Sequence, residues 1–243
     1  YREYDLVHED GEDVLRAVPG TGLGILRSDF LRSSSFDALP PEIRARARDS
    51  RPLIITKSTT RSTVHRPGYL DYIGVKKIVD GEVVGERRFL GLFSRAAYTE
   101  NVARIPVLRR KVDELYELTG FIPNSYSGRD LLEAIETYPR DELFQTPTPQ
   151  LYKVLLAVLH LKERKQLRLF LRSDEFGRFI SALVYLPRDR YNTENRLKIQ
   201  EILLRELDGV SLEYTSRVTE SVLARLHFVV RVDPTLPKDE RKP

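Results

Sequence analysis

The sequence predicts an α+β protein in which two small antiparallel sheets are separated by a helical segment. Three observations lead to this prediction. Alternating strand patterns fill much of residues 1–100, the hydrophobic period becomes helical over about residues 101–145, and strand patterns return after a further helix. With 243 residues, the chain is long enough to form two domains of ordinary size.

Residues 1–100 are expected to form the first sheet. The dipeptide Asp80-Gly81 lies between two strand patterns and favours a tight hairpin, because glycine tolerates the positive φ that such a turn demands. Pro40-Pro41-Glu42 is expected to open a short helix. The outline is that of a sensor-type α+β domain of the PAS kind. The expected strands are Tyr1–Val7, Leu23–Leu26, Leu53–Lys57, Tyr69–Val79 and Val83–Ser94.

Residues 101–147 are expected to form a helical connector. A first helix places its apolar residues on one face and is expected to end at Gly120. A second, short helix is expected over Asp130–Tyr138, before Pro139. The apolar face of the first helix consists of Ile105, Leu108, Val112 and Leu115.

Residues 148–232 are expected to form an ACT-like domain, followed by a linker over residues 233–243. The predicted order αββαββ is the βαββαβ order of ferredoxin-like domains started at a different point. Thr148 is expected to cap the first helix, and Gly209 to close the second. The predicted elements are a helix to about Arg164, strands Leu167–Arg172 and Arg178–Leu186, a helix from Asn192 or Thr193, and strands Ser211–Val218 and Val222–Val232.

The sequence offers no catalytic group and no metal site. Cysteine is absent, the four histidines have no metal-binding spacing, and no nucleophile motif occurs. We expect His160 to lie in a core and His227 to lie on a solvated sheet face with Arg225. The carboxylate pairs Asp113-Glu114 and Asp141-Glu142 are expected on exposed helix faces.

The composition of the chain indicates where the protein is located and which kinds of partner it lacks. The net charge of +4 is spread among interspersed acids and bases, without the basic, aromatic-rich stripe of a nucleic-acid binder, so no nucleic-acid partner is expected. No apolar run is long enough to cross a membrane. The lack of cysteine and of a signal peptide favours the cytoplasm. Because the chain opens on Tyr1 within a strand pattern, it is expected to be part of a longer polypeptide.

Two segments are candidate binding sites. Arg188, Asp189, Arg190 and Asn192 precede a helix, whose first N–H groups point outward and suit a carboxylate-sized ligand. The alternative is that Asn192 or Thr193 simply caps that helix. The run Lys57–Thr63 combines cations and hydroxyls that suit an anion, and its alternative is a polar strand end.

Several runs of the sequence, which together cover nearly the whole chain in order, carry a family resemblance. They are Ser62–Pro67, Tyr69–Val75, Phe89–Tyr98, Arg104–Val112, Tyr138–Phe144, Leu186–Glu194 and Arg217–Val230. These runs resemble the long N-terminal region of the large bacterial NAD-specific glutamate dehydrogenases.

The resemblance implies a regulatory segment with PAS-like and ACT-like domains and no catalytic residue. It implies that the parent enzyme uses NAD to convert L-glutamate to 2-oxoglutarate and ammonium, while the segment itself binds no cofactor. The implied partners are other domains of the same polypeptide, other subunits of a homo-oligomer, and an amino-acid effector. Two alternatives remain open, a purely structural interaction module and, more remotely, a nucleic-acid binder.

Overall fold

The computed structural model describes residues 1–9, 12–27, 34–35, 51–65, 68–164, 166–218 and 221–232. The chain divides into two compact units, Tyr1–Ser94 and Arg95–Pro243, and each is described by itself. The helix predicted to open at Pro40-Pro41-Glu42 and the linker predicted over residues 233–243 lie outside the described residues.

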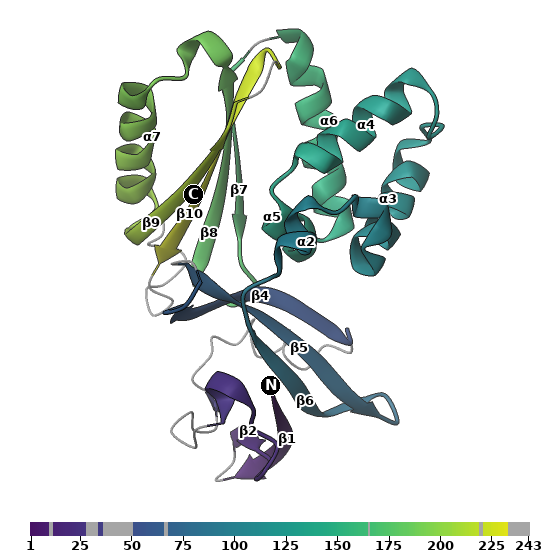
Figure 1. Ribbon diagram of the computed structural model, residues 1–243, viewed down its shortest axis with the longest axis vertical. Helices are drawn as coiled ribbons and strands as arrows, with labels where there is room; N and C mark the ends of the chain where they lie inside the picture. The colour runs from purple at the N-terminus through teal and green to yellow at the C-terminus, as the bar shows by residue number, and fades with distance from the viewer. Residues whose placement is uncertain are drawn as a thin grey trace. The chain divides into compact units, whose positions relative to one another are not determined.

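The first unit contains one antiparallel sheet with the strand order β3-β2-β1-β6-β5-β4 (Figure 1). Its first strand pairs with its last, and Tyr4 of that first strand is 1% exposed. The elements are β1 (Arg2–Glu9), β2 (Glu12–Ala17), the 3-10 helix η1 (Gly24–Leu26), β3 (Ser34–Ser35), β4 (Leu53–Arg61), β5 (Tyr69–Val79) and β6 (Glu82–Gly91).

Two predictions in this unit were wrong. Residues 23–26 are not a strand: Gly24–Leu26 form a single 3-10 turn whose Leu26 is buried. The strand β2 was missed, although the sequence between Glu9 and Glu12 is Asp-Gly, the same hairpin signal that was used at Asp80-Gly81. A run of four apolar or glycine residues is too short for its period to distinguish a strand from one helical turn.

The second unit begins with helices and ends with a four-stranded antiparallel sheet of order β7-β8-β10-β9. Gly120 ends α3 in the left-handed conformation, with φ 67°, as its position in the sequence predicts. The elements are α2 (Arg95–Thr99), η2 (Val102–Arg104), α3 (Pro106–Thr119), α4 (Tyr126–Thr137), α5 (Arg140–Gln145), α6 (Thr148–Arg164), β7 (Arg168–Ser173), β8 (Phe179–Pro187), η3 (Arg188–Arg190), α7 (Thr193–Glu206), β9 (Gly209–Arg217) and β10 (Leu223–Val232).

Both faces of this sheet are covered, so β8 is apolar along almost its whole length. One face packs against α7 and contains the fully buried Leu226 and Phe228. The helices α4, α5 and α6 lie on the side of the opposite face (Figure 1). Tyr185 and His227 belong to that face: Tyr185 lines a pocket with Ala134 of α4 and Val158 of α6, and His227 lies near Glu142 of α5. The helix α6, placed by the sequence analysis at the start of the ACT-like unit, packs on α3 and α4 on that opposite side.

Gly209 has a different role from the one predicted. The left-handed residue at the end of α7 is Asp208, with φ 49°, and Gly209 is the first residue of β9. A Cβ atom on Gly209 would lie 2.5 Å from Val230 Cγ1 and 2.9 Å from Leu204 Cδ2. The position therefore requires glycine for close packing between α7 and β10.

Replacing Gly209 by alanine is expected to destabilise the second unit by about 1–3 kcal/mol, the usual cost of overpacking a core. Urea unfolding measures this loss. Gly91→Ala is the matched control, because a Cβ on Gly91 meets no atom within 4 Å. Equal stabilities of the two variants would contradict the packing role of Gly209.

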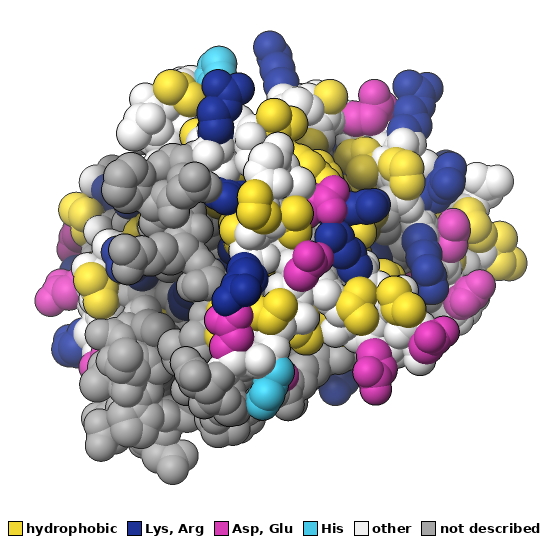
Figure 2. Space-filling model, turned by 90° about the horizontal axis from the view of Figure 1, so that it is seen from below, with side chains coloured by type: hydrophobic (Ala, Val, Ile, Leu, Met, Phe, Trp, Pro, Cys, Tyr) yellow, Lys and Arg dark blue, Asp and Glu magenta, His cyan; other side chains and the backbone are white. Residues whose placement is uncertain are grey.

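The surface mixes charges of both signs. On the face drawn in Figure 2, Lys and Arg side chains are interspersed with Asp and Glu. Some form exposed ion pairs within one helix, such as Lys198–Glu194 at 2.7 Å and Arg110–Glu114 at 3.1 Å. Such pairs contribute only tenths of a kcal/mol each. Among the described residues, no helix is long and apolar enough to cross a membrane.

Candidate functional site

The residues predicted to bind an effector lie together at the turn between β8 and α7. Arg188, Asp189 and Arg190 form the exposed 3-10 helix η3, and Asn192 is the N-cap of α7. The Asn192 side chain accepts a hydrogen bond from the backbone N–H of Asn195 at 2.7 Å. The amide oxygen of Asn192 is therefore used by the helix, while the two arginines remain at the surface. Binding at this turn stays a prediction.

The second candidate, the run from Lys57, begins with a residue that already has a carboxylate partner. Lys57 Nζ lies 2.5 Å from Asp71 Oδ1, and both side chains are largely buried. The other oxygen of Asp71 accepts a hydrogen bond from the backbone N–H of Phe93 at 2.8 Å. This pairing accounts for the Lys57 charge without an anion.

A buried ion pair joins α5 to the sheet. Glu142 is 3% exposed, so the prediction that it lies on an exposed helix face was wrong. Arg172 of β7 donates Nε to Glu142 Oε2 and Nη2 to Oε1, both at 2.8 Å. Burial alone raises the pKa of Glu142, but the charge and hydrogen bonds of Arg172 outweigh it and hold the pKa well below its ordinary value of 4.5.

His227 extends this cluster across the sheet. It is 5% exposed, which corrects the prediction of a solvated histidine. Its Nε2 lies 3.0 Å from Ser181 Oγ and 3.7 Å from Glu142 Oε1. The alternation of β10 does place a polar face opposite an apolar one, as predicted, but that polar face meets helices rather than water. His160, predicted to lie in a core, is exposed instead.

Lys111 fixes the end of α5 from the side of α3. Its Nζ donates three hydrogen bonds, to the carbonyl oxygens of Leu143 at 2.7 Å, Phe144 at 2.9 Å and Thr146 at 2.7 Å. Three donors are the full capacity of a charged ammonium group. Burial, with a further contribution from the Arg172 charge, lowers the pKa of Lys111 to about 8. Helices α3 and α5 and strand β7 are thus held as one body.

The Glu142–Arg172 pair predicts an acid-dependent loss of stability. Because the folded-state pKa of Glu142 is depressed, its contribution is present above its ordinary pKa of 4.5 and is lost as the pH falls below that value. Unfolding free energies measured between about pH 7 and pH 3 should therefore fall more steeply for the wild type than for Glu142→Gln. Parallel pH profiles for the two proteins would contradict the depressed pKa.

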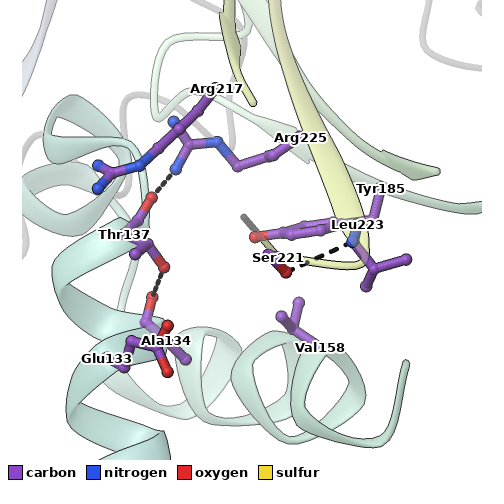
Figure 3. Close-up of a pocket in the computed structure, with 9 residues that line it drawn as sticks. All are labelled: Glu133, Ala134, Thr137, Val158, Tyr185, Arg217, Ser221, Leu223 and Arg225. Atoms are coloured by element: carbon purple, nitrogen blue, oxygen red, sulfur yellow. Dashed lines mark hydrogen bonds between the residues drawn. The ribbon is translucent and has the colours of Figure 1, made fainter. Parts of the chain in front are cut away.

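A small pocket lies between the sheet and the helices α4 and α6 (Figure 3). Its volume is about 60 Å³. Figure 3 shows the guanidinium of Arg225 beside the carbonyl of Thr137, to which it donates a hydrogen bond, with Arg217 next to it. Sequence reasoning missed this pocket. The lining residues are Glu133, Ala134, Thr137, Val158, Tyr185, Arg217, Ser221, Leu223 and Arg225.

Three of the lining residues form one row across the sheet. Arg225 is the register partner of Tyr185 on β8 and of Arg217 on β9. The signal available in the sequence was the pair of arginines in neighbouring predicted strands, but strand register is needed to see that they face each other. Among the described residues, no group of three or more His, Asp or Glu side chains is placed to hold a metal ion.

Comparisons with known proteins identify two segments of the second unit. Residues 105–164 match the family model described as glutamate dehydrogenase, helical motif 1, and residues 168–242 match glutamate dehydrogenase, ACT2 domain. The prediction of an ACT-like domain in the C-terminal part of the chain is therefore confirmed. The buried cluster around Glu142 joins these two segments, since Glu142 lies in the first and Arg172 in the second.

Three relatives extend the match to nearly the whole chain. Identity is 38% over 240 residues, or 98% of the chain, with the NAD-specific glutamate dehydrogenase of Halomonas elongata. It is 44% over 183 residues (75% of the chain) with that of Pseudomonas aeruginosa, and 40% over 212 residues (87%) with that of Mycobacterium tuberculosis. The chain spans only 15%, 11% and 12% of the lengths of these relatives. It belongs to the NAD-specific glutamate dehydrogenase family and carries that family's helical motif 1 and ACT2 domain.

Proposed function

We propose that this chain is a non-catalytic regulatory and assembly segment of an NAD-dependent glutamate dehydrogenase. The parent enzyme would convert L-glutamate, NAD and water to 2-oxoglutarate, ammonium and NADH in the cytoplasm, as a homo-oligomer. The observation that carries this proposal is the match of 98% of the chain to 15% of one NAD-specific glutamate dehydrogenase. The segment itself would bind neither NAD nor a metal ion.

The proposed role rests on coupling between the helical motif and the ACT2 sheet. The bidentate pair of Glu142 and Arg172, and the three bonds from Lys111, join the two segments through buried polar contacts. A change in the packing of the ACT2 sheet would therefore shift α5 and α3 through these contacts. The first unit is proposed to be a PAS-like domain, which is supported by its single antiparallel sheet with the first strand paired to the last.

A thermal-unfolding screen of the chain against amino acids, 2-oxoglutarate and NAD tests the regulatory role. A ligand at about 100 times its dissociation constant adds roughly 2.7 kcal/mol of stability, which shifts the midpoint by several degrees. A saturable shift with one amino acid is the expected result, and loss of the shift in Arg188→Ala or Arg190→Ala would locate the site at η3. No shift with any compound contradicts effector sensing.

The alternative is a purely structural module that joins parts of the same polypeptide or neighbouring subunits. It is favoured by the use of Asn192 as a helix cap, since that reduces the polar groups left for a ligand at η3. This alternative predicts no ligand response. It also predicts that a variant such as Arg172→Ala changes the oligomeric state of the full-length protein, as measured by sedimentation.

A further inference from the structure

The row of Tyr185, Arg225 and Arg217 lacks a negative charge. Arg217 and Arg225 are directly opposite each other on adjacent antiparallel strands, where like charges repel. No ion pair within the described part of the chain joins a carboxylate to either of them. Thr137 provides Arg225 with a carbonyl acceptor, which carries only a partial charge.

Arg225 is also incompletely hydrogen-bonded. Its Nε is shielded from solvent and has no hydrogen-bond partner among the described residues. Burial lowers the pKa of Arg225, and although Tyr185 offsets part of this, Arg217 lowers it further. A buried donor without an acceptor costs about 1–3 kcal/mol, so an acceptor that reached this group would stabilise it.

The remaining lining residues fit a small organic acid. The hydroxyl of Tyr185, whose pKa burial raises to about 12, is protonated at neutral pH and can donate a hydrogen bond. In Figure 3 this hydroxyl points toward α4, into the space beneath the two arginines. Ala134, Val158 and Leu223 supply apolar walls. The exposed side chains of Arg217 and Glu133 leave the pocket open to solvent.

We propose that this pocket binds the carboxylate of a small organic acid between Arg217 and Arg225. Guanidinium groups bind carboxylates through paired, charge-assisted hydrogen bonds. A volume of about 60 Å³ holds a carboxylate group, and the rest of the ligand extends past the rim at Glu133. The site would clamp β9 and β10 to the end of α4, and thus the ACT2 sheet to the helical motif.

The pocket can bind a small acid whether or not the segment is regulatory. Only the conclusion that such binding regulates the enzyme rests on the proposed function. The test is a calorimetric titration of the 243-residue chain with L-glutamate, 2-oxoglutarate and acetate. Saturable binding is expected. Arg217→Ala is expected to weaken it by at least about tenfold, and Tyr185→Phe by about fivefold. These two variants leave the bond between Arg225 and Thr137 in place.

Arg168→Ala is the matched control, because Arg168 extends the same cross-strand row beyond Tyr185 but does not line the pocket. Its affinity should equal that of the wild type. Tighter binding of L-glutamate than of 2-oxoglutarate would identify an amino acid as the ligand, and equal binding of acetate would identify the carboxylate alone.

Absence of saturable binding, or binding that Arg217→Ala and Tyr185→Phe leave unchanged, would overturn the proposal. If Arg188→Ala abolished binding instead, the effector would bind at η3. That result would contradict binding between Arg217 and Arg225 but would support the proposed regulatory function. Failure of the pocket proposal can therefore be distinguished from failure of the proposed function.

Discussion

Replacing Arg172 by alanine is expected to lower the free energy of unfolding of the second unit by about 3–5 kcal/mol. Stability falls because Glu142 is only 3% exposed, so that without Arg172 its buried carboxylate has no counter-ion. His227 at 3.7 Å cannot replace the two hydrogen bonds from Arg172. Urea unfolding followed by circular dichroism measures the change.

Two further variants test whether the unpaired buried charge of Glu142 causes this loss of stability. Arg168→Ala removes an exposed arginine from the same strand and is expected to change stability by less than about 0.5 kcal/mol. The double variant Glu142→Leu with Arg172→Met removes both charges and should regain most of the stability, because a buried pair can be replaced by apolar side chains. A single variant Arg172→Ala as stable as wild type would show that the pair does not hold α5 to the sheet.

Replacing Phe228 by alanine is expected to destabilise the same unit by about 3–5 kcal/mol. Phe228 is 0% exposed, lies in the core between the sheet and α7, and has the ring of Tyr214 at 6.1 Å. The truncation leaves a cavity that neighbouring strands cannot close. Tyr126→Ala is the matched control, since that ring is 78% exposed and its loss should be nearly neutral. Similar midpoints for both variants would contradict this description of the core.

Long periodic segments were predictable from the sequence, and the details of their contacts were not. The strict alternation of residues 222–232 predicts β10, and the helical spacing of Leu108, Val112 and Leu115 predicts α3, whose end at Gly120 was also correct. The short run 23–26 failed because its period cannot be read over four residues.

The errors at Glu142, His227 and Gly209 share one physical cause. Each was interpreted from its neighbours in the chain, while its environment is set by a partner distant in sequence. Arg172 lies 30 residues from Glu142, and Ser181 lies 46 residues from His227. The pocket was missed for the same reason. The sequence does not give the register of β9 and β10, which places Arg217 and Arg225 opposite each other. Arg188–Asn192 could be located in advance because a helix N-terminus is a local feature.

Glutamate-dependent formation of NADH tests the central claim most directly, measured on the 243-residue chain beside the full-length parent protein. The full-length protein is expected to turn over L-glutamate and NAD, and the chain alone is expected to show no turnover at any glutamate concentration. NADH formation by the isolated chain would contradict the assignment of a non-catalytic segment. A full-length protein that is folded yet inactive with glutamate and NAD would contradict the proposed parent activity.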